Sequence, residues 1–174
     1  MIQIEPEPPG IASSREALLD QTFGPARLAK TAERLREGRL PAAGLSFIAE
    51  DAGKLVGTVR FWHLRIGGGV DALLLGPVAV ASGHAGRGIG AALIERGLIS
   101  AERLAHRAVL LVGDESYYRR FGFHADLTRN KELPGPVDRR RFLARELDPG
   151  ALEGASGLVR PAGLFDPARG LRAA

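Results

Sequence analysis

The pattern of apolar and polar residues in the first forty positions predicts a strand followed by helical structure. The two residue types alternate over positions 1–7, up to a Pro-Pro-Gly break, as in a half-buried strand. Ser13 or Ser14 can cap the helix that follows. The buried side of this helix is expected to comprise Ala17, Leu18 and Leu19. Apolar residues then continue at helical spacing from Leu28 to Gly38.

Positions 45–80 predict three antiparallel strands. Leu45–Glu50 and Leu55–Ile66 are joined by an Asp-Ala-Gly-Lys turn, which makes them a hairpin. A run of three glycines then turns the chain into a long apolar strand, Val70–Val80. Pro77 lies inside this strand, and proline is tolerated there only at a bulge or a splay, where its missing donor is not needed.

The second half of the chain predicts alternating helices and strands. A helix is expected from about Gly90 to Ala105, followed by the buried strand Ala108–Val112. A short helix that carries Tyr118, a strand at Phe123 and a final strand at Arg141–Leu147 complete the predicted elements.

A glycine-rich turn, Gly83–Gly90, connects the strand that ends at Val80 directly to a helix. Glycines allow consecutive backbone N–H groups to point into one concavity, and a helix N-terminus adds about half a positive charge. The turn therefore predicts an anion site, with a phosphorylated cofactor as its ligand.

Three phosphate-binding patterns compete for this turn. The Walker loop requires Lys and Ser or Thr after its last glycine, but Gly90 is followed by Ala91 and Ala92, which excludes it. A dinucleotide fingerprint could be placed on Gly86, Gly88 and Ala91, but no acidic residue ends a strand about 20 residues later. The third pattern is an apolar strand with valine, a five-residue turn and then Q/R-x-x-G-x-G/A.

This third pattern resembles the pyrophosphate loop of the GNAT acetyltransferase superfamily. Counted from Val80, the two glycines of the pattern fall on Gly88 and Gly90. The polar position falls on Ala85, which departs from the pattern, although Arg87 follows two residues later. The departure removes one side chain but leaves the backbone amides in place.

A second block of residues resembles the same family. The strand Ala108–Val112 is followed by Asp114, where many relatives carry Asn, and then by a Y-x-x-x-G-F element formed by Tyr118, Gly122 and Phe123. The two blocks occur in the family's order and at its separation, which makes the resemblance specific.

The resemblance implies the α/β (α+β) GNAT fold, a mixed and mostly antiparallel sheet that is splayed at the cofactor site and flanked by helices. Residues 1–150 are expected to form this domain. Residues 151–174 are expected to form a Pro/Gly/Ala-rich tail that packs on the domain or extends from it.

The resemblance also implies that acetyl-CoA donates an acetyl group to an amine of a small molecule or a protein, by direct attack in a ternary complex. The pantetheine arm would pair with the free edge of the strand at Val78, Ala79 and Val80, and the Val80 N–H would polarise the thioester carbonyl. Tyr118 would be the general acid, with a half-buried structural aromatic, like Tyr117, as the alternative. The pyrophosphate would be bound at Ala85, Gly86, Arg87, Gly88, Gly90 and Ala91.

Neither a general base nor an acceptor pocket has a signature in the sequence. The candidate bases are Glu50, His63, Asp71, His84 and Asp114, and none has a spacing that distinguishes it. The mixed charges of residues 27–37 are typical of a solvated helix face. A CoA-binding sensor without turnover therefore remains an alternative to an enzyme.

Composition narrows the remaining classes. The 174 residues suit one domain, and the absence of cysteine rules out disulfides, thiolate metal sites and Cys nucleophiles, while four scattered histidines have no metal-ligand spacing. No apolar stretch is long enough for a membrane span and no signal segment is present, so a cytoplasmic protein is expected. The net charge of +4 comes mostly from dispersed arginines, which makes nucleic-acid binding a minor alternative. A homodimer is an expectation by analogy alone.

Overall fold

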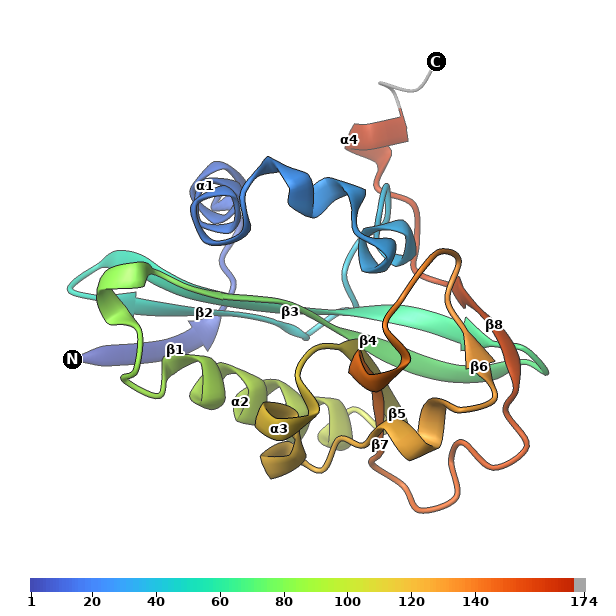
Figure 1. Cartoon of the computed structure of the whole chain (residues 1–174). Coiled ribbons are helices and arrows are strands. Elements are labelled where there is room, and N and C mark those ends of the chain that lie inside the picture. Colours follow the sequence, from blue (N-terminus) through green and yellow to red (C-terminus); the bar gives the residue numbers. More distant parts are fainter. Residues whose placement is uncertain (171–174) are drawn as a thin grey trace.

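The computed structural model describes residues 1–170, in which apolar strands form an open, mixed sheet of eight strands with helices on both faces (Figure 1). In chain order the strands are β1 (Ile2–Pro6), β2 (Ser46–Asp51), β3 (Lys54–Ile66), β4 (Val70–Val80), β5 (Ala108–Val112), β6 (Lys131–Glu132), β7 (Phe142–Glu146) and β8 (Gly157–Pro161). The α-helices are α1 (Ala12–Phe23), α2 (Ile89–Arg103), α3 (Glu115–Tyr118) and α4 (Pro167–Gly170). Short 3₁₀ helices are η1 (Pro25–Ala29), η2 (Thr31–Leu35), η3 (Ser82–His84), η4 (Arg119–Phe121), η5 (Ala125–Thr128) and η6 (Arg139–Arg141).

The main sheet has the order β1-β2-β3-β4-β5-β7, and β8 pairs with β3 and β6. Neighbours along the main path are antiparallel except β4 and β5, which are parallel. The mixed, mostly antiparallel sheet expected from the sequence is thereby confirmed.

Side chains alternate across β3 and supply both faces of the sheet with apolar residues. Val59 and Phe61 are buried in the core on the side of α2, whereas Trp62 and Leu64 belong to the core of the opposite face. Helix α2 can approach β3 closely because Gly97 has no side chain. A Cβ there would lie only 2.3 Å from Cε2 of Phe61. Figure 1 shows α2 and α3 beneath the sheet, with α1, η1 and η2 above it.

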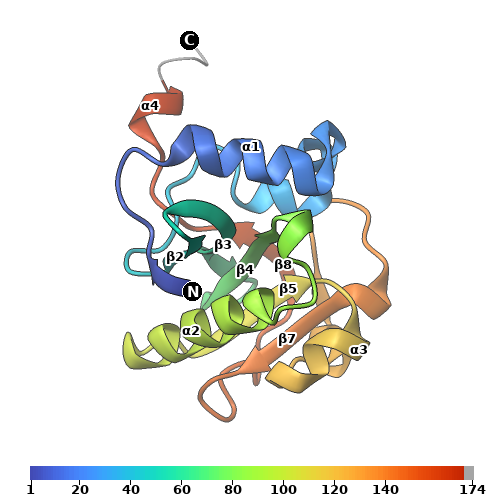
Figure 2. The ribbon, with the colours of Figure 1, turned by 90° about the vertical axis from the view of Figure 1, so that its left-hand side faces the viewer.

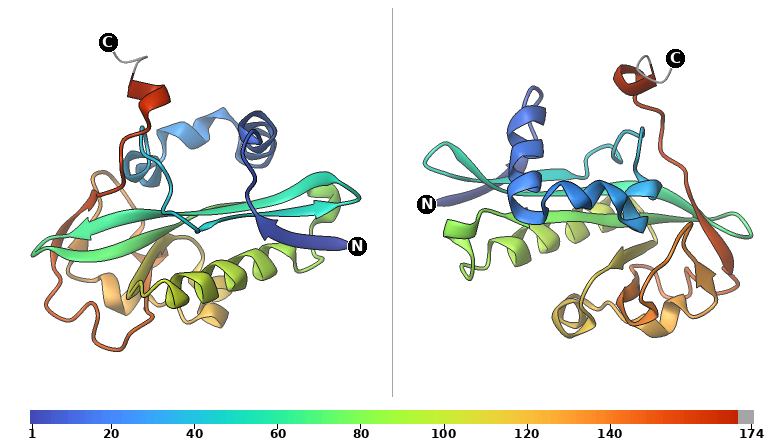
Figure 3. Two further views of the ribbon diagram at one scale, coloured as in Figure 1. Left: turned by 180° about the vertical axis from the view of Figure 1, so that it is seen from behind. Right: turned by 45° about the horizontal axis from the view of Figure 1, so that its top comes forward.

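The upper face of the sheet is covered by two separate apolar patches. Leu18 and Leu19 of α1 pack against Ala79 of β4. Farther along the sheet, Leu152 and Val159 from the C-terminal part of the chain are buried in the second core. The views in Figures 2 and 3 show α1 and the two 3₁₀ helices crossing this face, with the C-terminal segment rising beside them.

A bulge in β4 sets the geometry of the sheet centre. Val59 pairs with Val78 and Phe61 pairs with Leu75, so two residues of β4, Gly76 and Pro77, lie opposite one residue of β3. The expectation that Pro77 lies at a bulge is therefore confirmed.

The N-terminal helical region differs from its prediction. Helix α1 begins after Ile11, whose carbonyl accepts from the Arg15 N–H, so Ser13 and Ser14 lie inside the helix and neither caps it. Ala17 is exposed, and the buried residues are Arg15, Leu18 and Leu19 because Arg15 pairs with a carboxylate beside the sheet.

Residues 25–35 form η1 and η2 instead of one continuous helix, because Lys30 between them has extended backbone. Leu28, the first of the apolar residues at helical spacing, is exposed. Arg27 and Glu33 are buried instead, each in an ion pair.

The predicted strand at Phe123 is wrong. Gly122 has φ +84°, which turns the chain after η4, and His124 forms only an isolated bridge to Ala144. Phe123 is nevertheless fully buried in the α2-side core. Within the expected tail, β8 pairs with β3 from Leu64↔Pro161 to Ile66↔Val159.

Candidate active site

The edge of β4 that faces β5 loses its partner halfway along the strand. The two strands pair at Leu73↔Val109 and Leu74↔Leu110, and no further pair between them follows within the described chain. Beyond that point β4 still pairs with β3 through Val78, Ala79 and Val80. The sheet is therefore splayed as expected, and β4 presents an edge to which an extended ligand could add as a strand (Figure 2).

The direction of the backbone groups on this edge follows from one hydrogen bond. The Ala81 N–H donates to the Val56 carbonyl of β3 over 2.8 Å. Because N–H groups alternate between the two edges of a strand, those of Val80 and Val78 point toward the free edge. The Val80 N–H therefore points toward the edge at which the pantetheine arm is expected to bind.

A cavity of about 740 Å³, here called the splay cavity, opens where β4 and β5 diverge. Its floor includes Gly76, Pro77 and Val78 of β4 together with Tyr118. From the upper layer it is bordered by η1 and η2, and on the other side by the segment before β7. The predicted general acid, Tyr118, therefore lines the same cavity as Val78 of the predicted pantetheine strand, whereas Ala79 and Val80 are not among the lining residues.

The glycine-rich loop forms an open amide cradle at the start of α2. Gly86 and Gly88 both have φ +76°, a left-handed conformation that other residues adopt only with strain. A Cβ at either position would meet no atom within 4 Å, so space beside the backbone is free for a ligand. Gly88 is the N-cap of α2 and no side chain caps the helix.

The first turn of α2 leaves backbone donors for an anion. The Ala92 N–H closes the first turn by donating to the Gly88 carbonyl, whereas the amides of Gly90 and Ala91 precede it. The Ala85 N–H, in contrast, donates to Ser82 over 3.3 Å within η3. Of the predicted loop residues, Ala85 therefore has its amide engaged within the protein.

Asp51 at the end of β2 ties the loop to the sheet. His84 Nε2 lies 3.1 Å and Arg87 Nη1 lies 3.4 Å from Oδ2 of Asp51, and the N-terminal ammonium of Met1 lies 3.3 Å from Oδ1. The hydrogen bond from His84, followed by that from the N-terminus, lowers the pKa of Asp51. His84 and Arg87 thus anchor the loop.

Tyr118 is held in place by aromatic neighbours and by Gly113. Its ring packs edge-on against Phe123, with centroids 6.1 Å apart, and a Cβ at Gly113 would lie 2.4 Å from its Cε2. Burial, with a smaller contribution from Tyr117, raises the pKa of Tyr118 to about 12. The phenol therefore stays protonated at neutral pH and can act as a donor.

Tyr117, expected only as a structural aromatic, also lines the splay cavity. Its hydroxyl oxygen lies 3.7 Å from the position of a Cβ on Gly90, at the first turn of α2. The ring also stacks on the guanidinium of Arg120, 4.4 Å from its centroid. Adjacent tyrosines thus face different parts of the site.

Of the five candidate bases, Asp114 lines the splay cavity, where its carboxylate pairs with Arg141. The other four are not among its lining residues. Asp71 pairs with Arg65 in the exposed β3–β4 hairpin, and His63 packs against His106 with ring centroids 5.6 Å apart.

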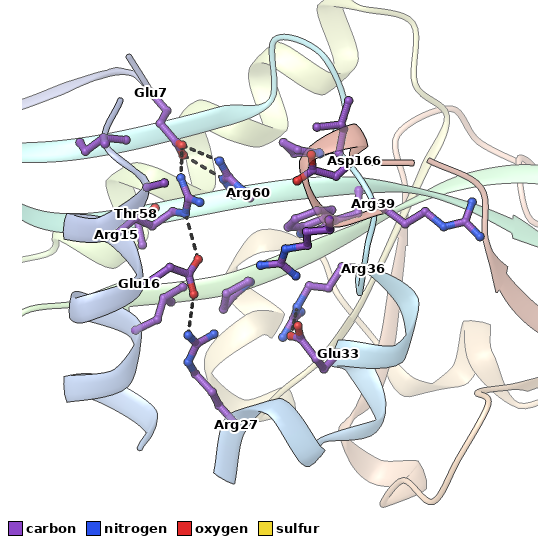
Figure 4. A pocket seen from close by; sticks show the side chains of 18 of the residues that line it. Glu7, Arg15, Glu16, Arg27, Glu33, Arg36, Arg39, Thr58, Arg60 and Asp166 are labelled. Atoms are coloured by element: carbon purple, nitrogen blue, oxygen red, sulfur yellow. Dashed lines mark hydrogen bonds and ion pairs between the residues drawn. The ribbon is translucent and has the colours of Figure 1, made fainter. Parts of the chain in front are cut away.

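A second cavity, of about 330 Å³, lies above β3 between α1, η2 and the C-terminal segment (Figure 4). We call it the charged cavity, because six arginines and four carboxylates line it. They are Arg15, Arg27, Arg36, Arg39, Arg60, Arg169, Glu7, Glu16, Glu33 and Asp166.

Ion pairs connect most of these charges. Glu7 Oε1 lies 2.5 Å from Nη2 of Arg60 and also pairs with Arg15. Glu16 Oε2 lies 2.6 Å from Nη2 of Arg27. Glu33 Oε2 lies 2.8 Å from Nε of Arg36, and burial lowers the pKa of this arginine. Arg27, Arg36 and Glu33 were expected on a solvated helix face, and that prediction is wrong.

The structure adds two observations on other classes of site. Among residues 1–170 no group of three or more His, Cys, Asp or Glu side chains is arranged to hold a metal ion. Over the same residues, no helix is both long and apolar enough to span a membrane.

Comparisons with known proteins extend the likeness to most of the chain. A family model described as "Acetyltransferase (GNAT) domain" matches residues 42–125. The N-acetyltransferase YhbS of Escherichia coli K12 is 30% identical over 159 residues, which are 91% of this chain and 92% of YhbS. YjhQ of the same organism, also named an N-acetyltransferase, is 30% identical over 128 residues, which are 72% of this chain and 70% of YjhQ.

Solved structures of GNAT acetyltransferases also resemble this chain over most of its length. The crystal structure of YhbS from Escherichia coli in complex with CoA has a TM-score of 0.78 and 30% identity, covering 92% of this chain and 89% of that one. A GNAT family acetyltransferase from Brucella melitensis in complex with acetyl-CoA has a TM-score of 0.59 and 29% identity, covering 83% of this chain and 95% of that one. The likeness in fold thus extends over most of the chain.

Proposed function

The chain belongs to the GNAT family of acetyltransferases, and from this premise we propose that it transfers an acetyl group from acetyl-CoA to an amine. The proposal rests on two backbone features that adjoin each other, the free edge of β4 and the amide cradle at the start of α2. The free edge of β4 leads from the splay cavity toward the amide cradle at the start of α2. Together they suit a ligand with a pyrophosphate at one end and an amide-containing arm at the other.

The residues present fit acetyl-CoA. The amides of Gly86, Arg87, Gly88, Gly90 and Ala91, with the helix dipole, would bind the pyrophosphate, and the open space beside Gly86 and Gly88 admits it. The backbone of Val78, Ala79 and Val80 would hold the pantetheine arm as an added strand. The Ala85 departure has little effect on this cradle, because the cradle consists of backbone groups.

The chemistry follows from the residues around the arm. When bound, acetyl-CoA supplies a thioester whose carbonyl carbon accepts the amine and whose sulfur leaves. The Val80 N–H, which points toward the free edge, would donate a hydrogen bond to the carbonyl oxygen and polarise it. The protonated hydroxyl of Tyr118 would donate its proton to the departing sulfur. Direct attack within a ternary complex is favoured because the sequence has no cysteine that could carry the acetyl group.

Calorimetric titration with CoA and acetyl-CoA, together with a thiol-release assay over a panel of amines, tests the proposal. We expect Gly88→Glu to abolish CoA binding, since it places a bulky anion in the cradle. Gly154→Glu is the matched control, because Gly154 also has a left-handed backbone, φ +77°, and free space around its Cβ position. If both variants lose CoA binding equally, backbone strain explains the loss and the cradle assignment fails.

One observation favours the alternative of a CoA-binding sensor. The polar position of the loop is occupied by Ala85, whose amide is bonded within η3. Amine-dependent thiol release that is lost in Tyr118→Phe would establish transfer. CoA binding without thiol release from any amine would favour the sensor, and absence of CoA binding would refute both.

A further inference from the structure

We propose that the acceptor is a small amine that also carries a carboxylate, and that the charged cavity binds this carboxylate. The inference rests on the proposed acetyl transfer and names the class of its second substrate. It is carried by the position of the charged cavity, by its unpartnered donors and by its size.

The charged cavity adjoins the splay cavity. Arg27, Arg36 and Pro77 line both of them. Nη1 of Arg36 lies 3.9 Å from the position that a Cβ would take on Gly76, so the guanidinium reaches the bulge in β4. A carboxylate held by Arg36 would therefore leave its amine close to the end of the pantetheine strand.

Polar donors in the charged cavity lack acceptors. Arg15 and Thr58 are 7% and 1% exposed, and within the described chain Arg15 Nε and Thr58 Oγ1 form no hydrogen bond. Arg15 Nε lies 3.4 Å from Glu16 Oε1, which is an ion contact without hydrogen-bond geometry. Buried polar atoms without partners are rare and costly, so these two indicate a ligand.

Two of the lining arginines have guanidinium N–H groups that are not used in hydrogen bonds within the described chain. Over residues 1–170, the side chain of Arg36 makes one hydrogen bond, from Nε to Glu33. Arg39 donates to the Gly163 carbonyl and stacks on Phe165 at 3.9 Å, and no ion pair involves it among the described residues. Figure 4 shows both arginines on the side of the cavity opposite α1.

Three of the four lining carboxylates are already paired with arginines, which disfavours a cationic ligand. Glu7 is shared by two arginines and Glu16 by two, while Glu33 holds Arg36. Asp166, the fourth lining carboxylate, accepts from the Ala168 N–H and forms no ion pair among the described residues. At Glu7, Glu16 or Glu33 a cationic group would have to displace a guanidinium, whereas a carboxylate supplies only acceptors and pairs bidentately with guanidinium groups. With six arginines against four carboxylates, the charge of the lining favours an acid.

The size of the charged cavity selects a small molecule. Its volume of about 330 Å³ lies at the lower end of the range for ligand pockets. It suits a molecule of amino-acid size, with the carboxylate between the arginines and the amine directed past Pro77.

The single tryptophan of the chain provides a direct assay. Trp62 lines the charged cavity, and its Nε1 donates to the Gly76 carbonyl over 2.6 Å. We would titrate the protein with CoA present, following Trp62 fluorescence, using glycine, β-alanine and γ-aminobutyrate and the matching amide of each. Thiol release from acetyl-CoA would be measured with the same six amines across a range of pH, so that different amine pKa values do not decide the ranking.

We expect at least one acid to bind tenfold or more tightly than its amide, because a hydrogen-bonded charge pair is lost in the amide. Thr58→Val should weaken binding of that acid about tenfold while leaving thermal stability unchanged or higher, since the hydroxyl it removes has no partner. Arg36→Met should remove the preference for the acid. Arg129→Met, which breaks an exposed pair with Asp126, is the control for loss of one arginine.

Three outcomes decide the inference. A preference for acids that is reduced in Thr58→Val and Arg36→Met, but kept in Arg129→Met, supports it. Equal binding of acids and amides, or no fluorescence change with any of the three acids, overturns it. If acids bind preferentially but no amine releases thiol, the acetyl transfer fails while the assignment of the charged cavity stands.

Discussion

Replacing Gly113 with alanine is expected to lower kcat by displacing Tyr118, although it removes no functional group. A Cβ on Gly113 would lie 2.4 Å from Cε2 and 2.9 Å from Cδ2 of Tyr118. Ordinary contact begins near 3.4 Å, so the ring has to move by about 1 Å. Overpacking of this kind costs about 1–3 kcal/mol of stability.

The kinetic effect follows from the same displacement. A shift of about 1 Å at a catalytic group costs on the order of 100-fold in rate, which corresponds to about 2.7 kcal/mol of activation free energy. The cradle residues and the β4 edge are not touched by the added methyl group, so CoA affinity should be unchanged. We therefore expect a fall of about 10- to 100-fold in kcat for thiol release, with calorimetric CoA binding as in the wild type.

Gly97→Ala is the matched control for loss of stability. A Cβ there would lie 2.3 Å from Cε2 of Phe61, so the strain is comparable, but it falls between α2 and β3, away from Tyr118. Both variants should unfold at lower temperature than the wild type. Only Gly113→Ala should lose kcat when both are assayed well below their unfolding temperatures.

A double variant tests whether Gly113 acts through Tyr118. Tyr118→Phe alone should reduce kcat, and adding Gly113→Ala should reduce it little further, because the hydroxyl is already absent. Multiplicative losses, or wild-type kcat in a destabilised Gly113→Ala protein, would refute the reasoning.

Two further predictions concern charge and pH. Glu7 is buried and pairs with Arg15 and Arg60, so Glu7→Gln should lower the free energy of unfolding by about 3–5 kcal/mol in denaturant titrations. Asp71→Asn, which breaks an exposed pair, should change it by less than about 1 kcal/mol, and equal effects would contradict the burial argument. Burial raises the pKa of Tyr118 from 10.0 to about 12, so the neutral phenol stabilises the fold below pH 10 and this contribution is lost as the pH rises to 12. Between pH 10 and 12 the stability of Tyr118→Phe, measured by thermal unfolding, should therefore fall less than the stability of the wild type.

The elements that the sequence predicts well are those decided by local pattern. The bounds of β4 and β5 agree with the sequence because β5 is a continuous apolar run ended by glycine and β4 is a mostly apolar stretch between two glycine-containing turns. The start of α2 follows from the glycine-rich loop, whose left-handed residues fix where the helix can begin. The amide cradle was therefore predictable, since its chemistry belongs to the backbone of one short segment.

The elements that the sequence does not predict depend on contacts between distant segments. Arg27 and Glu33 are buried only because ion pairs compensate their charge, so hydrophobic periodicity places the wrong residues inward. Strand β8 forms because residues 157–161 pair with the edge of β3, and no local sequence pattern predicts this pairing. The charged cavity joins residues from α1, η2 and β3, whose positions in the sequence show no common spacing.

The bulge in β4 connects the two cavities. Gly76 and Pro77 lie there opposite a single residue of β3, and this one extra residue shifts the register at the level where β4 no longer pairs with β5. Trp62 fixes the bulge from the β3 side through the Gly76 carbonyl, and Arg36 reaches the same glycine from η2. Pro77 in turn is part of the wall of both cavities. The bulge therefore lies between the β4 edge proposed to hold acetyl-CoA and the guanidinium proposed to hold the acceptor.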